Sequence, residues 1–297
     1  MTTHIDLHFR GSDRVIATAV LVGPDGVSLV DPGPSSCLHA LEDGLRHLGL
    51  SLRDVRSLLI THIHLDHAGA VGTIVERVPA IRVHVHERGA PHMVDPAKLL
   101  ASAGRLHGDQ MDVLWGAFLP VPSANINVLR GGERLAVAGT TLQVAYTPGH
   151  AKHHVSFLDE TTGAAYVGDT GGIRVSGDYL LAPTPPPDID LSAWRDSLAA
   201  IEAWQPVSLF LTHFGVVTAA KAHLARFRAT LAAQAEAVRQ SLSAGNTDEE
   251  RTRVFVEQMR REVRQAMPEH EARATELAAP FDQLWQGLAR YWQKMQS

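Results

Sequence analysis

The chain has 297 residues, of which 45% are hydrophobic and 20% are charged, and its formal net charge is −5 at pH 7. This composition is typical of a globular protein with a sizeable core, and the negative charge, without a dense run of lysine and arginine, argues against a dedicated nucleic-acid binder. The single cysteine, Cys37, excludes an intrachain disulfide and a cysteine-rich metal site and fits a reducing compartment, whereas the 17 histidines are unusually many.

The chain begins without an apolar signal segment, and it contains no apolar run long enough to span a bilayer. We therefore expect a cytoplasmic protein whose partner is a small-molecule substrate rather than a nucleic acid or a membrane. A homodimer is an open alternative at this stage.

The N-terminal part of the chain alternates between strand and helix patterns. A Gly23-Pro24-Asp25-Gly26 turn separates two β-rich runs, which is the signature of a hairpin. The expected elements are strands at 15–22 and 27–30, a helix at 36–48, a strand at 55–60, a helix at 68–78 and a strand at 81–85. This order predicts an α/β arrangement rather than a helical bundle.

Residues 87–125 interrupt this rhythm with four prolines around two short helical patterns. A long insertion of this kind in a compact domain is commonly a lid or a binding loop. Met111, Trp115 and Phe118 either line a substrate pocket or pack on the core, and His107 is a further candidate for contact with substrate.

The β pattern resumes after the insertion and gives way to helices near the C-terminus. Strands are expected at 126–129, 133–137, 141–146, 155–158, 164–167 and 207–211, with one helix at 190–203 capped by Asp190. Later, Thr247 and Glu250 form a capping box at the start of a helix. We expect a catalytic domain over residues 1–217 and a helical appendage over residues 218–297, which packs on the core or on a dimer partner, or else contacts substrate.

Four of the expected strands are followed directly by residue types that bind metals. In the loop after residue 60, His62 and His64 are two residues apart on extended backbone and can reach one ion together, while Asp66 and His67 lie past the bend. Since strand ends gather at one edge of a sheet, we expect all these side chains to meet there. The candidate ligands are His62, His64, Asp66, His67, His150, Asp169 and His213.

These motifs resemble those of the metallo-β-lactamase superfamily of metallohydrolases. The resemblance extends over about residues 15–213 and is carried by Asp31-Pro32-Gly33, Thr61-His62-Ile63-His64-Leu65-Asp66-His67, Thr147-Pro148-Gly149-His150, Gly168-Asp169-Thr170 and Thr212-His213. It implies an αββα sandwich with metals at one edge, followed here by the helical C-terminal appendage. It further implies one metal held by His62, His64 and His150, a second held by Asp66, His67 and His213, and Asp169 bridging both.

Two divalent metal ions would supply a hydroxide nucleophile and polarise a substrate carbonyl, and Asp66 could act with them in catalysis by orienting that hydroxide or moving its proton. We expect zinc, with iron or manganese as alternatives. The resemblance to glyoxalase-II-like and lactonase-like members implies a dinuclear hydrolase of a small ester, lactone or thioester.

Other functions remain open from the sequence. Within the same site, the alternatives are a phosphodiesterase or a β-lactam hydrolase, and, with iron, an oxidoreductase. A non-enzymatic ligand-sensing module is a third class. Arg174 could meet an anionic group or form a surface ion pair, and His153 or His154 could support a ligand by hydrogen bonding or could simply start a strand.

Overall fold

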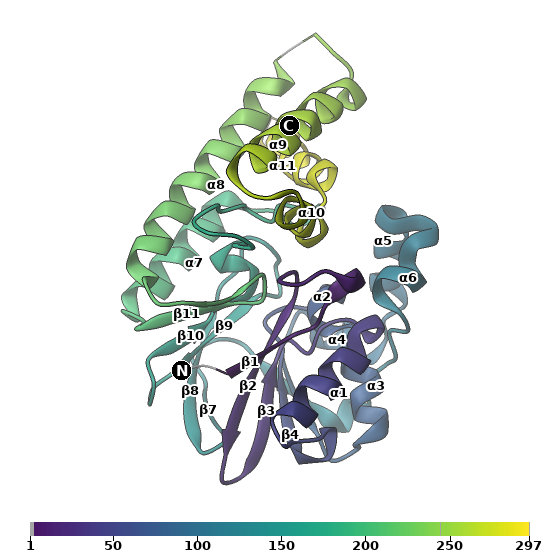
Figure 1. The fold of residues 1–297 in the computed structure, drawn as a ribbon, viewed down its shortest axis with the longest axis vertical. Helices are drawn as coiled ribbons and strands as arrows, with labels where there is room; N and C mark the ends of the chain where they lie inside the picture. Colours follow the sequence, from purple (N-terminus) through teal and green to yellow (C-terminus); the bar gives the residue numbers. More distant parts are fainter. Residues whose placement is uncertain (1–2, 244, 297) are drawn as a thin grey trace.

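The structure is a computed structural model that describes residues 3–243 and 245–296. Two six-stranded sheets form the centre of the molecule, and helices cover their outer sides (Figure 1). The sandwich of sheets and helices confirms the expected α/β fold class.

The first sheet has the strand order β1-β2-β3-β4-β5-β6. Its first three strands pair antiparallel and the others pair parallel. The strands are β1 (Thr3–Asp6), β2 (Ala17–Gly23), β3 (Gly26–Val30), β4 (Val55–Leu59), β5 (Arg82–His86) and β6 (Ile126–Leu129).

The second sheet has the strand order β12-β11-β10-β9-β8-β7, and only β10 and β11 pair parallel. Its strands are β7 (Arg134–Val137), β8 (Thr140–Tyr146), β9 (Val155–Asp159), β10 (Ala164–Tyr166), β11 (Ser208–Leu211) and β12 (Gly215–Val217). The short edge strands β1 and β12 were not expected from the sequence.

The two sheets enclose a core between them because their strands alternate side chains from one face to the other. On β2, Ala17, Ala19 and Leu21 belong to a cluster that also contains Phe157 of β9 and Phe210 of β11. The residues between them on β2 face the other way, toward the helix layer, and this arrangement fixes the register of each strand.

Figure 1 shows α1 and α3 on the outer side of the first sheet, and α7 and α8 on the side of the second. The helices that follow the first-sheet strands are α1 (Leu38–His47), α2 (Leu65–Ala68), α3 (Val71–Arg77), α4 (Ala90–Val94), α5 (Ala97–His107) and α6 (Met111–Trp115). The 87–125 insertion therefore contains three α-helices, where two helical patterns were expected.

The C-terminal part is helical, as expected, beginning after α7 (Leu191–Ala203) and the last strand. It consists of α8 (Ala220–Leu242), α9 (Asp248–Ala266), α10 (Glu269–Ala278) and α11 (Phe281–Gln296). The Thr247 capping box and the Asp190 cap are both present. On α9, Phe255 is buried and Val256 is only partly buried.

These helices pack against the sandwich through close backbone contact. A Cβ on Gly287 of α11 would lie 2.0 Å from the carbonyl oxygen of Thr184, so only glycine allows this approach. One continuous apolar cluster includes residues of the first sheet and of α8–α11. The division into two domains at residue 217 stays a prediction. Among the described residues, no helix has the length and apolar character needed to cross a membrane.

Candidate metal centre

The candidate ligands lie in the segments that directly follow four strands of the two sheets. His62 and His64 follow β4, and His150 follows β8. Asp169 lies in a short 3₁₀ helix (Gly168–Gly171) after β10, and His213 follows β11. The structure brings all seven predicted ligands together in three overlapping groups.

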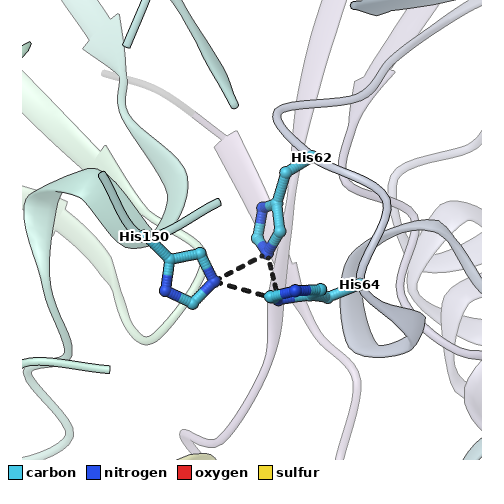
Figure 2. Close-up of side chains that lie close together, drawn as sticks. All are labelled: His62, His64 and His150. Carbon is cyan, nitrogen blue, oxygen red and sulfur yellow. Dashed lines mark hydrogen bonds between the residues drawn. The ribbon is translucent and has the colours of Figure 1, made fainter. Parts of the chain in front are cut away.

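Three imidazole nitrogens converge in the first group. The Nε2 atom of His62 lies 2.9 Å from His64 Nδ1 and 3.2 Å from His150 Nε2, and the last two nitrogens are 2.9 Å apart. Figure 2 shows the three rings pointing at one another from opposite sides of the site. Nitrogens bound tetrahedrally to zinc at 2.0–2.1 Å would lie about 3.3 Å apart, so this cluster fits one metal ion.

The second group consists of Asp66, His67 and His213. The Oδ2 atom of Asp66 lies 3.3 Å from His213 Nε2 and 3.6 Å from His67 Nε2. His67 Nε2 and Asp169 Oδ1 are buried and make no hydrogen bond of ordinary geometry within the described part of the chain. Buried polar atoms of this kind need a partner, and a cation would provide one.

The carboxylate of Asp169 faces both groups with different oxygens. Its Oδ1 lies 3.2 Å from His67 Nε2 and 3.6 Å from His213 Nε2, while its Oδ2 lies 3.3 Å from His150 Nε2. This is the placement that a bridging carboxylate requires.

Hydrogen bonds behind the ligands orient three of the imidazole rings. The Nδ1 atoms of His150 and His213 lie 2.8 Å and 2.6 Å from the carbonyl oxygens of Pro183 and Val15, which accept their protons. Nδ1 of His67 lies 2.8 Å from Asp31 Oδ2. In the neutral ring, a proton held on Nδ1 leaves the Nε2 lone pair facing the centre, which is the state that binds metal.

Asp31 has a supporting role that the sequence analysis did not assign. It is fully buried, and its carboxylate accepts bonds from the Thr61 amide and hydroxyl and from the Thr212 hydroxyl, besides His67. It thereby connects the loops after β3, β4 and β11. In the sequence, its position directly after a strand, like that of the ligands, could have indicated this role.

Burial and neighbouring charges shift the imidazole pKa values of the two groups in opposite directions. Burial lowers the pKa of His62 and His150 below the ordinary value and that of His64 to about 3, which keeps these imidazoles neutral. Burial alone would also lower the pKa of His67 and His213, but the carboxylates of Asp66 and Asp169 raise both. The carboxylates therefore favour the protonated form of the imidazoles in the second group.

His154 and His153 lie directly behind the first group. His154 is fully buried, its Nδ1 is 2.9 Å from the Thr147 hydroxyl, and its ring stacks on His62 at 5.1 Å between centroids. His153 Nδ1 accepts a 3.4 Å bond from the Ile63 amide. Both therefore support the loop that carries the ligands.

An apolar cavity of about 200 Å³ opens over the cluster, and His64, Asp66, His150, Asp169 and His213 contribute to its floor. Its sides come from two parts of the chain that are distant in sequence, the α5–α6 segment and the α10–α11 segment. The C-terminal helices therefore border the site as well as packing on the core.

The predicted substrate residues divide between cavity and core. Trp115 and His107 line the cavity. Phe118 is instead buried in the main apolar cluster, Met111 packs against that cluster, and Arg174 is half-buried with its backbone amide bonded to the His213 carbonyl. None of these last three lines the cavity in the described part of the chain.

A two-sheet sandwich with a histidine and aspartate cluster at one edge defines a class of metal-binding proteins. Residues 12–239 match the model of the metallo-beta-lactamase superfamily. The chain belongs to this superfamily, whose members are in general hydrolytic metalloenzymes.

Similar proteins support this assignment. The archaeal protein ST1585 from Sulfolobus tokodaii has a structure with a TM-score of 0.67 at 20% identity, covering 96% of this chain and 97% of that one. TTHA1429 from Thermus thermophilus has a TM-score of 0.69 at 25% identity, over 95% and 89% of the two chains. These structures confirm the expected fold.

Curated relatives are matched over shorter regions. The ST1585 protein of Sulfurisphaera tokodaii is 28% identical over 54% of this chain and 61% of its own length. A hydroxyacylglutathione hydrolase of Xylella fastidiosa is 28% identical over 50% of this chain and 43% of its own length. The chain thus matches less than two thirds of the length of these relatives.

Proposed function

We propose that the protein is a dinuclear metal-dependent hydrolase that cleaves a small ester, lactone or thioester. The observation that carries this proposal is that one buried cluster contains two ligand groups, linked by a third that overlaps both, and that a different oxygen of Asp169 faces each of the two. Nitrogen and carboxylate donors in this arrangement suit zinc, and they also accept iron or manganese.

When bound, two such cations would make a nearby water easier to deprotonate and would polarise a substrate carbonyl. The chain itself holds the ligands in their binding states through the Pro183, Val15 and Asp31 acceptors.

Asp66 is the acid best placed to take part in proton transfer. Its side chain is 20% exposed and lines the cavity, whereas that of Asp169 is 5% exposed. We propose that Asp66 orients the attacking water and accepts its proton. The water oxygen then bonds to the carbonyl carbon, the C–O or C–S bond breaks, and the proton passes to the leaving group.

The thioester option has a specific observation behind it, namely the similarity to a hydroxyacylglutathione hydrolase over half of the chain. We keep it as one of three substrate types because that similarity covers less than half of the relative.

The test is an assay of the full chain loaded separately with zinc, iron or manganese. The panel contains lactones, esters, thioesters, phosphodiesters and β-lactams, and oxygen uptake is measured in parallel. We expect hydrolysis of carbonyl esters or thioesters that is abolished by chelation and restored by metal. Hydrolysis of phosphodiesters or β-lactams alone, or oxygen uptake with iron and no hydrolysis, would overturn the proposal.

A further inference from the structure

The cavity over the metal centre has two opposed walls. Leu106 of α5 and Trp115 of α6 belong to one wall, and Leu277 of α10 and Leu284 of α11 belong to the other. In Figure 1, α5 and α6 lie across from α10 on the side of the sandwich where α2 is found. The insertion and the C-terminal helices together make a compartment that neither makes alone.

The walls differ from the floor in polarity. Apart from the candidate ligands, the side chains that line the cavity are mainly leucine, alanine, proline and aromatic residues. Within the described part of the chain, neither lysine nor arginine lines it. Among the described residues, the one charged wall residue is Glu276, which is 33% exposed and bonded through both carboxylate oxygens to Arg260.

This charge pattern disfavours an anionic substrate group. A carboxylate or phosphate placed between the walls would lose its water without gaining a cationic partner, which costs several kcal/mol. It would also lie near the acid Glu276. An uncharged apolar group gains from the same transfer.

We propose that the cavity binds an uncharged apolar acyl or alkyl group, so that the substrate is a neutral ester, lactone or thioester with a short hydrocarbon chain. This inference rests on the proposed hydrolysis and deepens it. The scissile carbonyl lies at the polar floor, and the chain extends between Leu106 and Leu277. A volume of about 200 Å³ lies below the roughly 300–1,000 Å³ usual for ligand pockets, which favours a short chain.

The proposal separates this protein from a hydrolase of glutathione thioesters. Glutathione carries two carboxylates, and a site built for it needs cationic or amide donors to hold them. The walls offer Ser102, His107 and Gln283 as polar groups, and none of them is cationic in the manner of lysine or arginine. A glutathione thioester should therefore be a poor substrate.

The experiment measures kcat/KM for neutral p-nitrophenyl esters of increasing acyl length. It also compares a neutral thioester with a glutathione thioester of the same acyl group. For the wild-type protein, we expect a rise of about fourfold for each added methylene until the cavity is filled, followed by a fall. The glutathione thioester should be hydrolysed at least about tenfold less efficiently than a neutral thioester.

Leu106→Trp and Leu277→Trp fill the cavity from its two walls. Each should move the preferred acyl length to a shorter chain and lower kcat/KM for the longest good ester by at least about tenfold, with little change for the acetate ester. Leu100→Trp is the matched control, because Leu100 is a partly buried leucine of α5 that does not line the cavity. It should leave the chain-length profile unchanged.

The outcomes distinguish this inference from the proposed function. Hydrolysis without dependence on chain length, or with a preference for the glutathione thioester, would overturn the cavity assignment and leave the hydrolase intact. If no ester or thioester is hydrolysed, calorimetry with hexanamide, an unreactive neutral analogue, decides. Binding that is lost in Leu277→Trp and kept in Leu100→Trp supports the cavity assignment alone, and absence of binding to the wild-type protein overturns it.

Discussion

The floor and the walls of the cavity are built on different physical principles. In the floor, largely buried imidazoles and carboxylates are held by specific hydrogen bonds, such as that between His67 and Asp31. In the walls, leucines and an indole pack without such bonds, and Trp115 is positioned by stacking on Phe9 at 5.5 Å between ring centroids. The floor therefore demands particular residue types, whereas the walls demand only shape and low polarity. The difference implies that chemistry belongs to the floor and selectivity to the walls.

The largest expected effect comes from the residue that joins the two halves of the floor. Asp169→Ala removes both oxygens that face the ligand groups, so kcat/KM should fall by at least about a thousandfold and bound metal should decrease. Asp178→Ala is the control, because its side chain is 80% exposed in an ion pair with Arg226. Equal activity of the two variants would contradict the role of Asp169.

Substitutions at two buried aspartates, Asp31 and Asp159, can show whether the hydrogen bonds behind the ligands act on metal affinity or only on the stability of the fold. Asp31→Asn removes an acceptor for His67 and for the Thr61 and Thr212 hydroxyls, so metal affinity should fall by about 10–100-fold. Asp159→Asn weakens a similar set of bonds, to Thr140 at the start of β8 and to Thr162 in the β9–β10 turn.

Both substitutions should destabilise the protein by about 1–3 kcal/mol, but only Asp31→Asn should weaken metal binding. Chelator competition measures the affinity, and urea unfolding measures the stability. An equal loss of metal affinity in both variants would show that Asp31 acts through stability alone.

Acid should lower the stability of the protein through His84, which lies on β5 in the sheet beside the floor. Burial, helped by Arg82, lowers the pKa of His84 from 6.5 to about 4, and Asn127 holds its Nδ1 at 2.8 Å. Below pH 6.5 the unfolded chain binds a proton that the folded chain does not bind until about pH 4. Stability should therefore fall as the pH drops through this window, by up to about 3 kcal/mol, with no contribution above it.

His84→Gln should remove this contribution. The measurement is the free energy of urea unfolding for the wild-type protein and the variant between about pH 4 and pH 7. The wild-type curve should fall more steeply in acid, and parallel curves would contradict the assignment.

The smallest expected effect concerns the backbone contact by which α11 packs against the sandwich. Gly287→Ala places a methyl group 2.0 Å from the Thr184 carbonyl, next to the Pro183 carbonyl that orients His150, and should destabilise the protein by about 1–3 kcal/mol. Gly104 of α5 has open space around it, so Gly104→Ala should stabilise the protein by about 0.5–1 kcal/mol. Thermal melting of both variants tests these opposite changes in stability. Equal shifts of the melting temperature in the two variants would contradict the prediction.

The floor could be predicted from the sequence because its signal is local. Each ligand follows a strand whose apolar pattern is visible, and His62 and His64 are spaced for extended backbone. The support by Asp31 was missed because it depends on the approach of Thr212, 181 residues away in the chain.

The walls could not be predicted because they depend on packing between distant segments. An apolar residue such as Phe118 follows the same pattern whether it faces the core or the cavity, and the structure places it in the core. Leu277 gave no functional signal, since its place in the cavity follows from the docking of α10 and α11 on the sandwich. The short strands β1 and β12 were missed because Thr3–Asp6 is largely polar and Gly215–Val217 has only three residues.

The central claim is that one floor holds two metal ions and that Asp169 lies between them. The most direct measurement is the metal content of the wild-type protein and of His67→Ala after saturation with zinc and removal of loosely bound ions. We expect two ions per chain for the wild type and one for His67→Ala, which keeps the His62, His64 and His150 group but loses a ligand of the second. One ion in the wild-type protein, or two ions with full activity in His67→Ala, would contradict the account.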